Sequence, residues 1–534
     1  MTMRSMLLAA VAAALVAAPA YAAPKPAGAK GEVANGVEAR AKLGQVINDT
    51  LFSFAELGFQ ELETATYLTA LLEKEGFKVE RGTSGLPSGW VARWSNGSGG
   101  PVIAIGSDVD GIPKASQMPG VPWRKPMVEG GPGHGEGHNS GQAVNILAVL
   151  AVKDWMIRTK TPGTLVLWPG VAEELLGSKA WYVRDGLFKD VDVAMFTHVN
   201  SELKTFWGQP SGTGLVSVKY DFKGEAAHSA GLPWRGRSAL DAAMLMGMGW
   251  DMRREHLRPQ TRSHYIIPDG GDQPNVVPST ASTWFYFREM DFKRIKDLWA
   301  VGNDMADGAA KMTGTTVTSQ ILGSAAPGHF NKPLAEAMHA NIEMVGLPKW
   351  DADDQAFAKA VQTMLGNDKV DGMPTKIAAL APPPDEKTRE SGGSDDIGDV
   401  SWTVPTVELY YPSNIPGLPG HNWANAIAMA TPIAHKGIVV GAKTMAMTLV
   451  DLFTKPQLIT AAKAYFNDVQ TKDQKYVPML GATDKPPVAT NRDVMAQFKA
   501  EQSKFYYQPE KYGTYLEQLG VTWPTLVKPA DGAK

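Results

Sequence analysis

The sequence predicts an α/β fold in which a mostly parallel sheet flanked by helices carries an inserted α/β sandwich lid. Apolar, strand-like runs at 102–108, 164–168 and 193–197 alternate with helical segments, as in a parallel sheet with right-handed crossovers. From about residue 212 the pattern changes to alternating strands and amphipathic helices, which indicates a second unit. A chain of 534 residues is also too long for one hydrophobic core, so we expect at least two domains.

Residues 1–22 are predicted to be a signal peptide. Arg4 supplies a positive charge, an apolar segment follows at 6–18, and residues 20–22 (Ala-Tyr-Ala) form a cleavage site. A buried or membrane-spanning helix is the alternative, but this segment is shorter than the roughly 18 residues a span needs. We expect no later apolar stretch of that length and no disulfide, because the chain has no cysteine. The sequence thus predicts a periplasmic or secreted protein with no membrane span after signal removal.

The first part of the main domain is assigned to residues 23–211. It opens with a flexible Pro- and Gly-containing lead-in at 24–36. Apolar residues at helical spacing predict helices, and short continuous apolar runs predict buried strands. The expected elements are a largely helical region at 39–75, strands at 90–94, 102–108, 164–168 and 193–197, and helices at 140–156 and 175–188.

Residues 212–326 are assigned to the inserted lid, and the main domain resumes at 327–455. The lid elements are strands at 215–222, 283–288 and 315–322 and helices at 238–253 and 292–312. A helix from Leu334 and a strand at 406–411 are expected to return to the first sheet. Residues 456–534, rich in Lys, Pro and Tyr, are assigned to a peripheral C-terminal extension.

The charge balance argues against nucleic acid as a partner. The formal net charge is −3 at pH 7, and no Lys/Arg run could follow a phosphate backbone.

A glycine-rich segment at 133–139 (Gly-His-Gly-Glu-Gly-His-Asn) lies just before the helix expected at 140–156. Glycines between polar residues let the backbone turn tightly, so that alternate side chains converge on one point. Glu136 and His138 are therefore candidate ligands of a divalent metal ion. Read by itself, the segment could also be a solvated polar loop.

Two adjacent carboxylates, Glu173 and Glu174, follow the strand expected at 164–168. Such a pair beside an apolar strand end is costly unless a cation neutralises one member. One glutamate can then bind metal while the other acts as general base toward a metal-bound water. The alternative is an exposed helix N-terminus with acidic residues in its first turn.

Two histidines complete a set of candidate ligands. His198 directly follows the strand expected at 193–197, and His421 lies in a Gly/Pro loop. Polar residues after neighbouring parallel strands meet at one edge of a sheet, where such folds bind ligands. The mixed nitrogen and oxygen donors suit two closely spaced divalent ions. The candidate ligands are Glu136, His138, Glu174, His198 and His421, with Glu173 left free as the base.

The ordered motifs resemble the co-catalytic metallopeptidase family that includes aminoacylases and glutamate carboxypeptidases, and within it the aminobenzoyl-glutamate hydrolase and hippurate hydrolase branch. The likeness extends from about Leu51 to Pro487. The segments that carry it are 55–60, 107–113, 133–139, 172–174, 223–230, 274–278, 393–402 and 420–423.

The resemblance implies that His138, Glu174, His198 and His421 hold two metals, that Glu173 activates water, and that Asp110 orients a metal ligand. It also implies that the lid domain forms a homodimer, through which His228 reaches a neighbouring subunit's site and stabilises the oxyanion. Asn275 and Arg288 match lid positions that hold substrate carboxylate or carbonyl groups, and Asp396 is expected to shape the substrate end of the site.

Glu136 departs from the branch's pattern, which has cysteine at this position. A carboxylate is a harder ligand than a thiolate and can bridge two ions, so we expect Mn²⁺ or a more labile Zn²⁺ pair. The resulting prediction is a metal-dependent hydrolase that cleaves the amide bond of N-acyl or N-aroyl amino acids or short peptides. Two alternatives remain: a periplasmic binding protein of the same fold with weakened or lost catalysis, and an esterase-type metallohydrolase.

Overall fold

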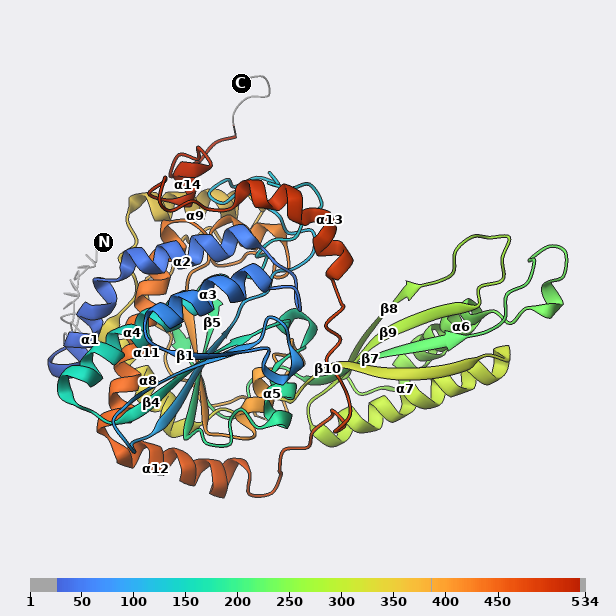
Figure 1. Ribbon diagram of the computed structural model, residues 1–534, viewed down its shortest axis with the longest axis horizontal. Helices are drawn as coiled ribbons and strands as arrows, with labels where there is room; N and C mark the ends of the chain where they lie inside the picture. The colour runs from blue at the N-terminus through green and yellow to red at the C-terminus, as the bar shows by residue number, and fades with distance from the viewer. Residues whose placement is uncertain (1–25, 386, 529–534) are drawn as a thin grey trace, which may run out of the picture.

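The computed structural model describes residues 26–385 and 387–528, so the predicted signal peptide at 1–22 lies outside the described residues. Figure 1 shows a large body and an elongated one that projects from it. The large body contains a seven-stranded sheet, and the elongated one contains a four-stranded sheet.

The larger sheet has the strand order β1-β2-β4-β3-β5-β11-β6. Its four central strands, β4, β3, β5 and β11, run parallel, and antiparallel strands border them on both sides. The predicted α/β fold with a mainly parallel central sheet is therefore confirmed. The strands span Lys78–Arg81 (β1), Trp90–Asn96 (β2), Val102–Asp108 (β3), Gly163–Gly170 (β4), Val193–Asn200 (β5), Lys204–Thr205 (β6) and Thr406–Pro412 (β11).

Helices surround this sheet. The longest, α11 (Pro432–Thr454), packs against α4 (Gly141–Thr159) and contacts β11. By length and composition α11 could cross a membrane, so the expectation that no later stretch is long and apolar enough is wrong; 78% of its most apolar window is buried, as in a core helix. The other helices of this body before residue 456 are Gly28–Glu38 (α1), Ala41–Phe54 (α2), Leu62–Lys74 (α3), Lys179–Asp185 (α5), Lys332–Val345 (α8), Ala352–Met364 (α9) and Ile397–Ser401 (α10).

The helical region expected at 39–75 is interrupted at its centre, between α2 and α3. Ala55 ends α2 in the left-handed conformation, with φ of 45°. Gly58 then approaches the segment after β4 so closely that a Cβ on it would lie 2.8 Å from Cα of Ala172. The connecting loop, residues 55–61, leaves the helical path because it packs against the segment that carries Glu173.

The helix expected at 175–188 is also too long. Only Lys179–Asp185 is α-helical, after a short 3-10 turn, η2, at Glu173–Leu175. Leu176 is left-handed, and its carbonyl accepts a hydrogen bond from the backbone N–H of Ser324 in the other sheet. This long-range bond takes the place of one that a continuous helix would make.

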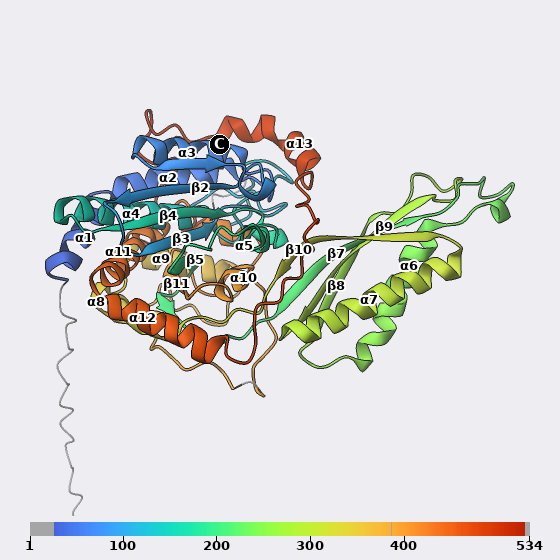
Figure 2. The same ribbon diagram turned by 60° about the horizontal axis from the view of Figure 1, so that its bottom comes forward.

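The smaller sheet is antiparallel, with the strand order β10-β7-β9-β8. Two helices, α6 (Ala239–Arg253) and α7 (Phe292–Thr313), pack together along it (Figure 2). Its strands span Gly214–Lys223 (β7), Arg262–Asp269 (β8), Thr280–Glu289 (β9) and Thr316–Ala325 (β10). The sequence-based prediction missed β8, an edge strand whose side chains are mostly exposed and which contains a proline.

The C-terminal segment runs along the junction of the two bodies (Figures 1 and 2). It contains α12 (Pro456–Tyr465), a π-helical turn (Phe466–Gln470), α13 (Arg492–Gln502) and α14 (Tyr515–Gln518). The Tyr476 hydroxyl donates to Asp399 at 2.6 Å, and farther along Gln502 donates to the carbonyl of Ala55. The segment therefore braces the loop at 55–61 from outside.

Candidate metal centre and substrate pocket

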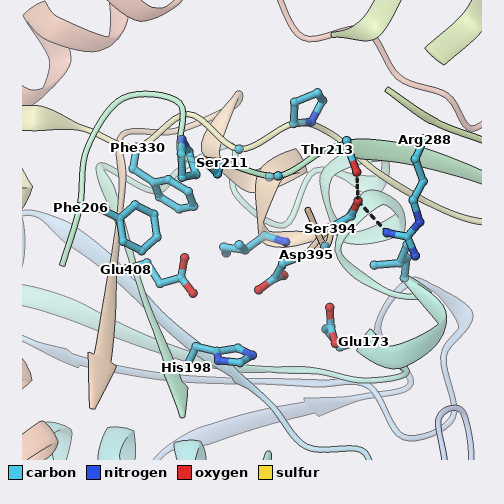
Figure 3. Close-up of a pocket in the computed structure, with 18 of the residues that line it drawn as sticks. Glu173, His198, Phe206, Ser211, Thr213, Arg288, Phe330, Ser394, Asp395 and Glu408 are labelled. Carbon is cyan, nitrogen blue, oxygen red and sulfur yellow. Dashed lines mark hydrogen bonds between the residues drawn. The ribbon is translucent and has the colours of Figure 1, made fainter. Parts of the chain in front are cut away.

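A cavity of about 350 Å³ opens beyond the carboxyl ends of β4, β5 and β11, where the two bodies meet. The larger body contributes Glu136, Glu173, Glu174, His198 and His421 to its lining, and the smaller one contributes Tyr286, Arg288 and Met290. Figure 3 shows Glu173 and His198 along one side of this space and Arg288 on another. An open α/β sheet places its ligand site at this end of the strands.

The glycine-rich segment at 133–139 turns so that Glu136 and His138 face the same point. Gly137, between them, has φ of 121°, a conformation that other residues rarely adopt. A Cβ on Gly137 would lie 2.6 Å from Cε of Met429, so packing also requires glycine there. His138 comes just before α4, whose buried side chains hold the segment against the sheet.

The structure brings the five predicted ligands together around Glu136. One carboxylate oxygen of Glu136 lies 3.5 Å from Nε2 of His198. The other lies 3.6 Å from Nε2 of His138 and 3.2 Å from Nε2 of His421. His421 Nε2 is also 3.3 Å from a carboxylate oxygen of Glu174. Glu136 therefore sits between all three imidazoles, as a bridging ligand would.

The imidazoles are oriented through their other ring nitrogens. Nδ1 of His138 lies 3.2 Å from Asp110, and Nδ1 of His198 lies 2.9 Å from the carbonyl of Val199. Donation from both Nδ1 atoms leaves each Nε2 free to act as a ligand. The second oxygen of Asp110 accepts the backbone N–H of Glu174 at 3.0 Å, so one carboxylate positions two of the candidate ligands.

The electrostatics of the cluster fit a divalent cation. Burial opposes ionisation of Glu136, but the hydrogen bond with His421 and the charges of His138 and His198 hold its pKa below the ordinary value. Burial and then the charge of Glu136 raise the pKa of Glu174 well above its ordinary value. Among the described residues, Nε2 of His138 and Oε1 of Glu174 are buried without a hydrogen-bond partner. A bound metal ion would give both of these unpaired ligand atoms a partner.

Glu173 lies beside this cluster, and its environment differs from that of Glu174. One of its carboxylate oxygens is 3.9 Å from Nε2 of His138. Burial raises the pKa of Glu173 well above its ordinary value, and the charges of Asp395 and Asp108 raise it further. The side chain is thus close enough to reach a water at the cluster and basic enough to hold a proton.

A buried glutamate in the loop at 55–61 positions the Glu173–Glu174 segment. Glu61 accepts the backbone N–H of Ala172 at 2.6 Å and the hydroxyl of Ser88 at 2.7 Å. Burial raises the pKa of Glu61 to about 8. Ala172 is left-handed, with φ of 50°, so the bond from Glu61 stabilises a strained backbone directly before the candidate base.

The four residues predicted to act from the lid or at the substrate end lie in different places. Arg288 lines the cavity, and its guanidinium donates to Ser394 at 3.0 Å. His228 and Asn275 lie together on the exposed part of the smaller body, and neither lines this chain's own cavity. Asp396 is fully buried behind the wall, whereas its neighbour Asp395 faces the cavity.

Sequence reasoning missed a buried lysine behind this wall. Lys179, at the start of α5, has no exposed surface, and its Nζ lies 2.6 Å from Asp108, 3.2 Å from Asp395 and in contact with Asp396. Burial opposes its charge, but these carboxylates hold the pKa of Lys179 well above its ordinary value. Nothing in the local sequence distinguishes Lys179 from a surface lysine.

Sequence reasoning also missed Glu408, which lies within β11 and lines the cavity. A signal for it was present in the sequence. A carboxylate in the middle of the apolar run Thr-Val-Glu-Leu-Tyr-Tyr at 406–411 should be costly unless it meets a partner.

Comparisons with known proteins agree with this architecture. Residues 212–311 match the peptidase dimerisation domain. The chain is 31% identical over 470 residues to one of the subunits of p-aminobenzoyl-glutamate hydrolase of Escherichia coli (strain K12), and the match covers 84% of this chain and 96% of that protein. It is 27% identical to the Xaa-Arg dipeptidase of Homo sapiens, over 82% of this chain and 92% of that protein. Among solved structures, an aminobenzoyl-glutamate utilization protein from Klebsiella pneumoniae shares the fold, with a TM-score of 0.54 and 17% identity over 79% of this chain and 98% of that one.

Identity of 31% over nearly the whole length of the E. coli subunit goes beyond a shared fold, and it confirms the family resemblance first indicated by the ordered motifs. The same motifs form the cluster of histidines and carboxylates described above. The chain belongs to the metallopeptidase and amidohydrolase family that contains p-aminobenzoyl-glutamate hydrolase, and it is a metal-dependent hydrolase of amide bonds.

Proposed function

We propose that the protein cleaves the amide bond of N-acyl or N-aroyl amino acids or short peptides, with two divalent ions and Glu173 as the general base. The observation that carries this proposal is the position of Glu136 between His138, His198 and His421. Glu173 lies alongside this cluster, with one carboxylate oxygen 3.9 Å from Nε2 of His138. The names of the relatives, an aminobenzoyl-glutamate hydrolase and a dipeptidase, support the same substrate class.

Two divalent ions, when bound by Glu136, His138, Glu174, His198 and His421, would polarise the scissile carbonyl and make water more acidic. Glu173 accepts the proton of the attacking water and returns it to the leaving nitrogen. Asp110 holds His138 and the backbone of Glu174 in place during this transfer.

Arg288 is the candidate group for the substrate carboxylate. Its Nε is buried without a partner among the described residues, so an anion in the cavity could accept from it. We assign Asn275 to the substrate carbonyl or carboxylate from a second copy of the chain, and Asp396 to support of the substrate end through its contact with Lys179.

Metal analysis provides the central test of the proposed function. The purified protein is expected to hold two equivalents of Zn²⁺ or Mn²⁺ and to lose amide hydrolysis when a chelator removes them, with recovery on readdition. Glu136→Gln keeps the shape of the side chain but removes its negative charge from between the three histidines, so the number of bound ions should fall from two towards one. Inductively coupled plasma mass spectrometry measures it. Glu202→Gln, an exposed carboxylate paired with Lys204, is the matched control and should keep both ions. Hydrolysis that persists without metal would refute the proposed chemistry.

We also propose that the chain forms a homodimer through the lid and that His228 completes the partner's site. β8 is an edge strand with unpaired backbone groups, and α6 beside it exposes Met244, Met248 and Met252. His228 accepts hydrogen bonds at Nδ1 from the backbone N–H groups of Ala230 and Gly231, so its Nε2 is available to donate.

The double substitution Met248→Glu with Ile266→Lys is expected to convert the dimer to a monomer and to lower kcat by about 10²- to 10³-fold, as for the loss of one oxyanion donor. Sedimentation velocity and steady-state kinetics measure the two effects. Met312→Glu, which changes an even more exposed methionine on α7, should leave both unchanged. A wild-type chain that sediments as a monomer with full activity would contradict this assembly. The name of the E. coli relative makes it one subunit of its hydrolase, and a requirement of this chain for a second, related chain would contradict the homodimer too.

An ester substrate series separates the amidase from an esterase-type metallohydrolase. We expect hydrolysis of the amide substrates to depend on bound metal and on Glu173. An activity confined to esters would overturn the assignment.

A further inference from the structure

Among the described residues, Glu408 is the one carboxylate of the cavity wall that neither joins the metal-ligand cluster nor forms an ion pair with a cation. It is 2% exposed, and its Oε1 is buried without a hydrogen-bond partner. Figure 3 shows its carboxylate directed into the cavity, on the side opposite Arg288. A buried carboxyl group without a partner costs stability, so its position points to a ligand that supplies the missing donor.

The other carboxylates of the cavity have their own counterparts. Glu136 and Glu174 contact His421, Glu173 lies beside His138, and Asp395 pairs with Lys179. Burial and then the charges of Asp395 and Asp108 raise the pKa of Glu408 well above its ordinary value, and the charge of Lys179 opposes this only in part. A hydrogen-bond donor or cation at Glu408 would offset these unfavourable contributions.

Three aromatic rings form the walls around Glu408. The rings of Phe206 and Phe330 are 4.8 Å apart, and those of Phe206 and Tyr410 are 5.2 Å apart. Tyr410 is two residues from Glu408 on β11 and faces the same cavity. Aromatic walls around a carboxylate form a site for a flat or aliphatic group that ends in a nitrogen, since ring faces attract cations and pack against aromatic groups.

The cavity therefore has a cationic side chain at one side and a carboxyl group at the opposite side. Arg288, from the lid sheet, lies on one side, Glu408, from the main sheet, lies on the other, and Glu173 lies between them along the wall that carries the metal-ligand cluster (Figure 3). An N-acyl amino acid has an obligatory carboxylate on its leaving amino acid. When Arg288 holds that carboxylate and the amide lies at Glu173, the acyl group extends toward Glu408.

We propose that Glu408 is a specificity-determining residue that binds a primary amine at the far end of the substrate's acyl group. The proposal rests on the proposed amide hydrolysis and narrows its substrates to aminoacyl or aminoaroyl amino acids. Phe206, Phe330 and Tyr410 enclose the body of the acyl group, and the carboxylate of Glu408 accepts the N–H groups of the amine.

A pair of substrates that differ in one group tests this assignment. 4-Aminobenzoyl-glutamate and 4-methylbenzoyl-glutamate are close in shape, but only the first can donate to Glu408. The wild-type holoenzyme is expected to prefer the amino compound by about 10- to 100-fold in kcat/KM, the range for a hydrogen bond to a charged group. Glu408→Gln should reduce this ratio several-fold, because a neutral acceptor binds the amine more weakly. Glu408→Leu should bring the ratio near one while hydrolysis of the methyl compound continues.

The control variants separate specificity from general damage. Glu408→Asp should retain part of the preference, and Glu202→Gln should leave it unchanged. Equal kcat/KM for the two substrates in the wild type, or a ratio unaffected by Glu408→Leu, would overturn the assignment. A Glu408-dependent preference for 4-methylbenzoyl-lysine over 4-methylbenzoyl-norleucine would overturn it as well, because the amine would then belong to the leaving amino acid. Failure of the wild-type holoenzyme to hydrolyse either glutamate compound would instead refute the proposed function.

Discussion

Glu173→Gln is expected to lower kcat for an N-acyl amino acid by about 10²- to 10⁴-fold, the range for loss of a general base. The glutamine keeps the size of the side chain but cannot accept the proton of the attacking water. Because Glu173 lies 3.9 Å from His138 and outside the contacts around His421, the metal content should remain that of the wild type. Steady-state kinetics, metal analysis and calorimetric measurement of substrate binding give the three quantities needed.

The adjacent residue supplies a matched comparison. Glu174 lies 3.3 Å from His421, and Glu174→Gln is expected to lose metal together with activity. If Glu173→Gln lost metal to the same extent, Glu173 would be a ligand instead of the base. If it kept full turnover, the general-base assignment would fail.

Lys179→Met is expected to lower the free energy of unfolding by about 3–5 kcal/mol, the cost of leaving buried charges without their partner. The lysine is the cation shared by Asp108, Asp395 and Asp396, two of which are almost wholly buried. Urea unfolding of the wild type and the variant, at one fixed metal concentration and pH 7, measures the difference.

The difference in the free energy of unfolding between the wild type and Lys179→Met should shrink as the pH falls from about 7 to 5. Burial already raises the pKa of Asp108 well above its ordinary value, and Asp396 is shifted in the same direction. Without Lys179 these carboxyl groups bind protons more readily in the folded than in the unfolded chain, so folding gains stability as the pH decreases. Lys204→Met, a surface lysine paired with Glu202, should cost no more than about 1 kcal/mol at either pH. Equal unfolding midpoints for wild type and Lys179→Met would show that the buried cluster contributes nothing.

Part of the candidate metal cluster was predictable because Glu174 and His198 lie at the carboxyl ends of parallel strands, which meet at one edge of the sheet. Glu136, His138 and His421 lie in glycine-containing loops instead, where residue type and the family resemblance indicated them. In the structure Glu174, after β4, lies 3.3 Å from His421, and His198, near the end of β5, lies 3.5 Å from Glu136. The positions of His228 and Asn275 follow no such rule within one chain. They lie on the exposed part of the lid, away from this chain's own cavity, so any role there depends on a second copy of the chain.

The loop at 55–61 and the segment at 175–178 show where local patterns were insufficient. Both lie within longer regions that were expected to be helical, yet Ala55 and Leu176 are left-handed. In each case contacts distant in sequence determine the conformation: the first loop packs against Ala172, and Leu176 bonds to Ser324. Intrinsic propensity is worth only fractions of a kcal/mol per residue, so such contacts override it.

The alternation of strands and helices, the family, and the five residues that converge at the candidate metal centre could all be predicted from the amino-acid order. They follow from periodicity, from polar residues at strand ends, and from glycine-rich motifs that resemble those of a known family. The folded chain was needed to show that Lys179 is the cation shared by three carboxyl groups and that Glu408 faces the cavity without a hydrogen-bond partner among the described residues. The energy of a charged group depends on its burial and on neighbours far away in the chain, and neither is present in the local sequence.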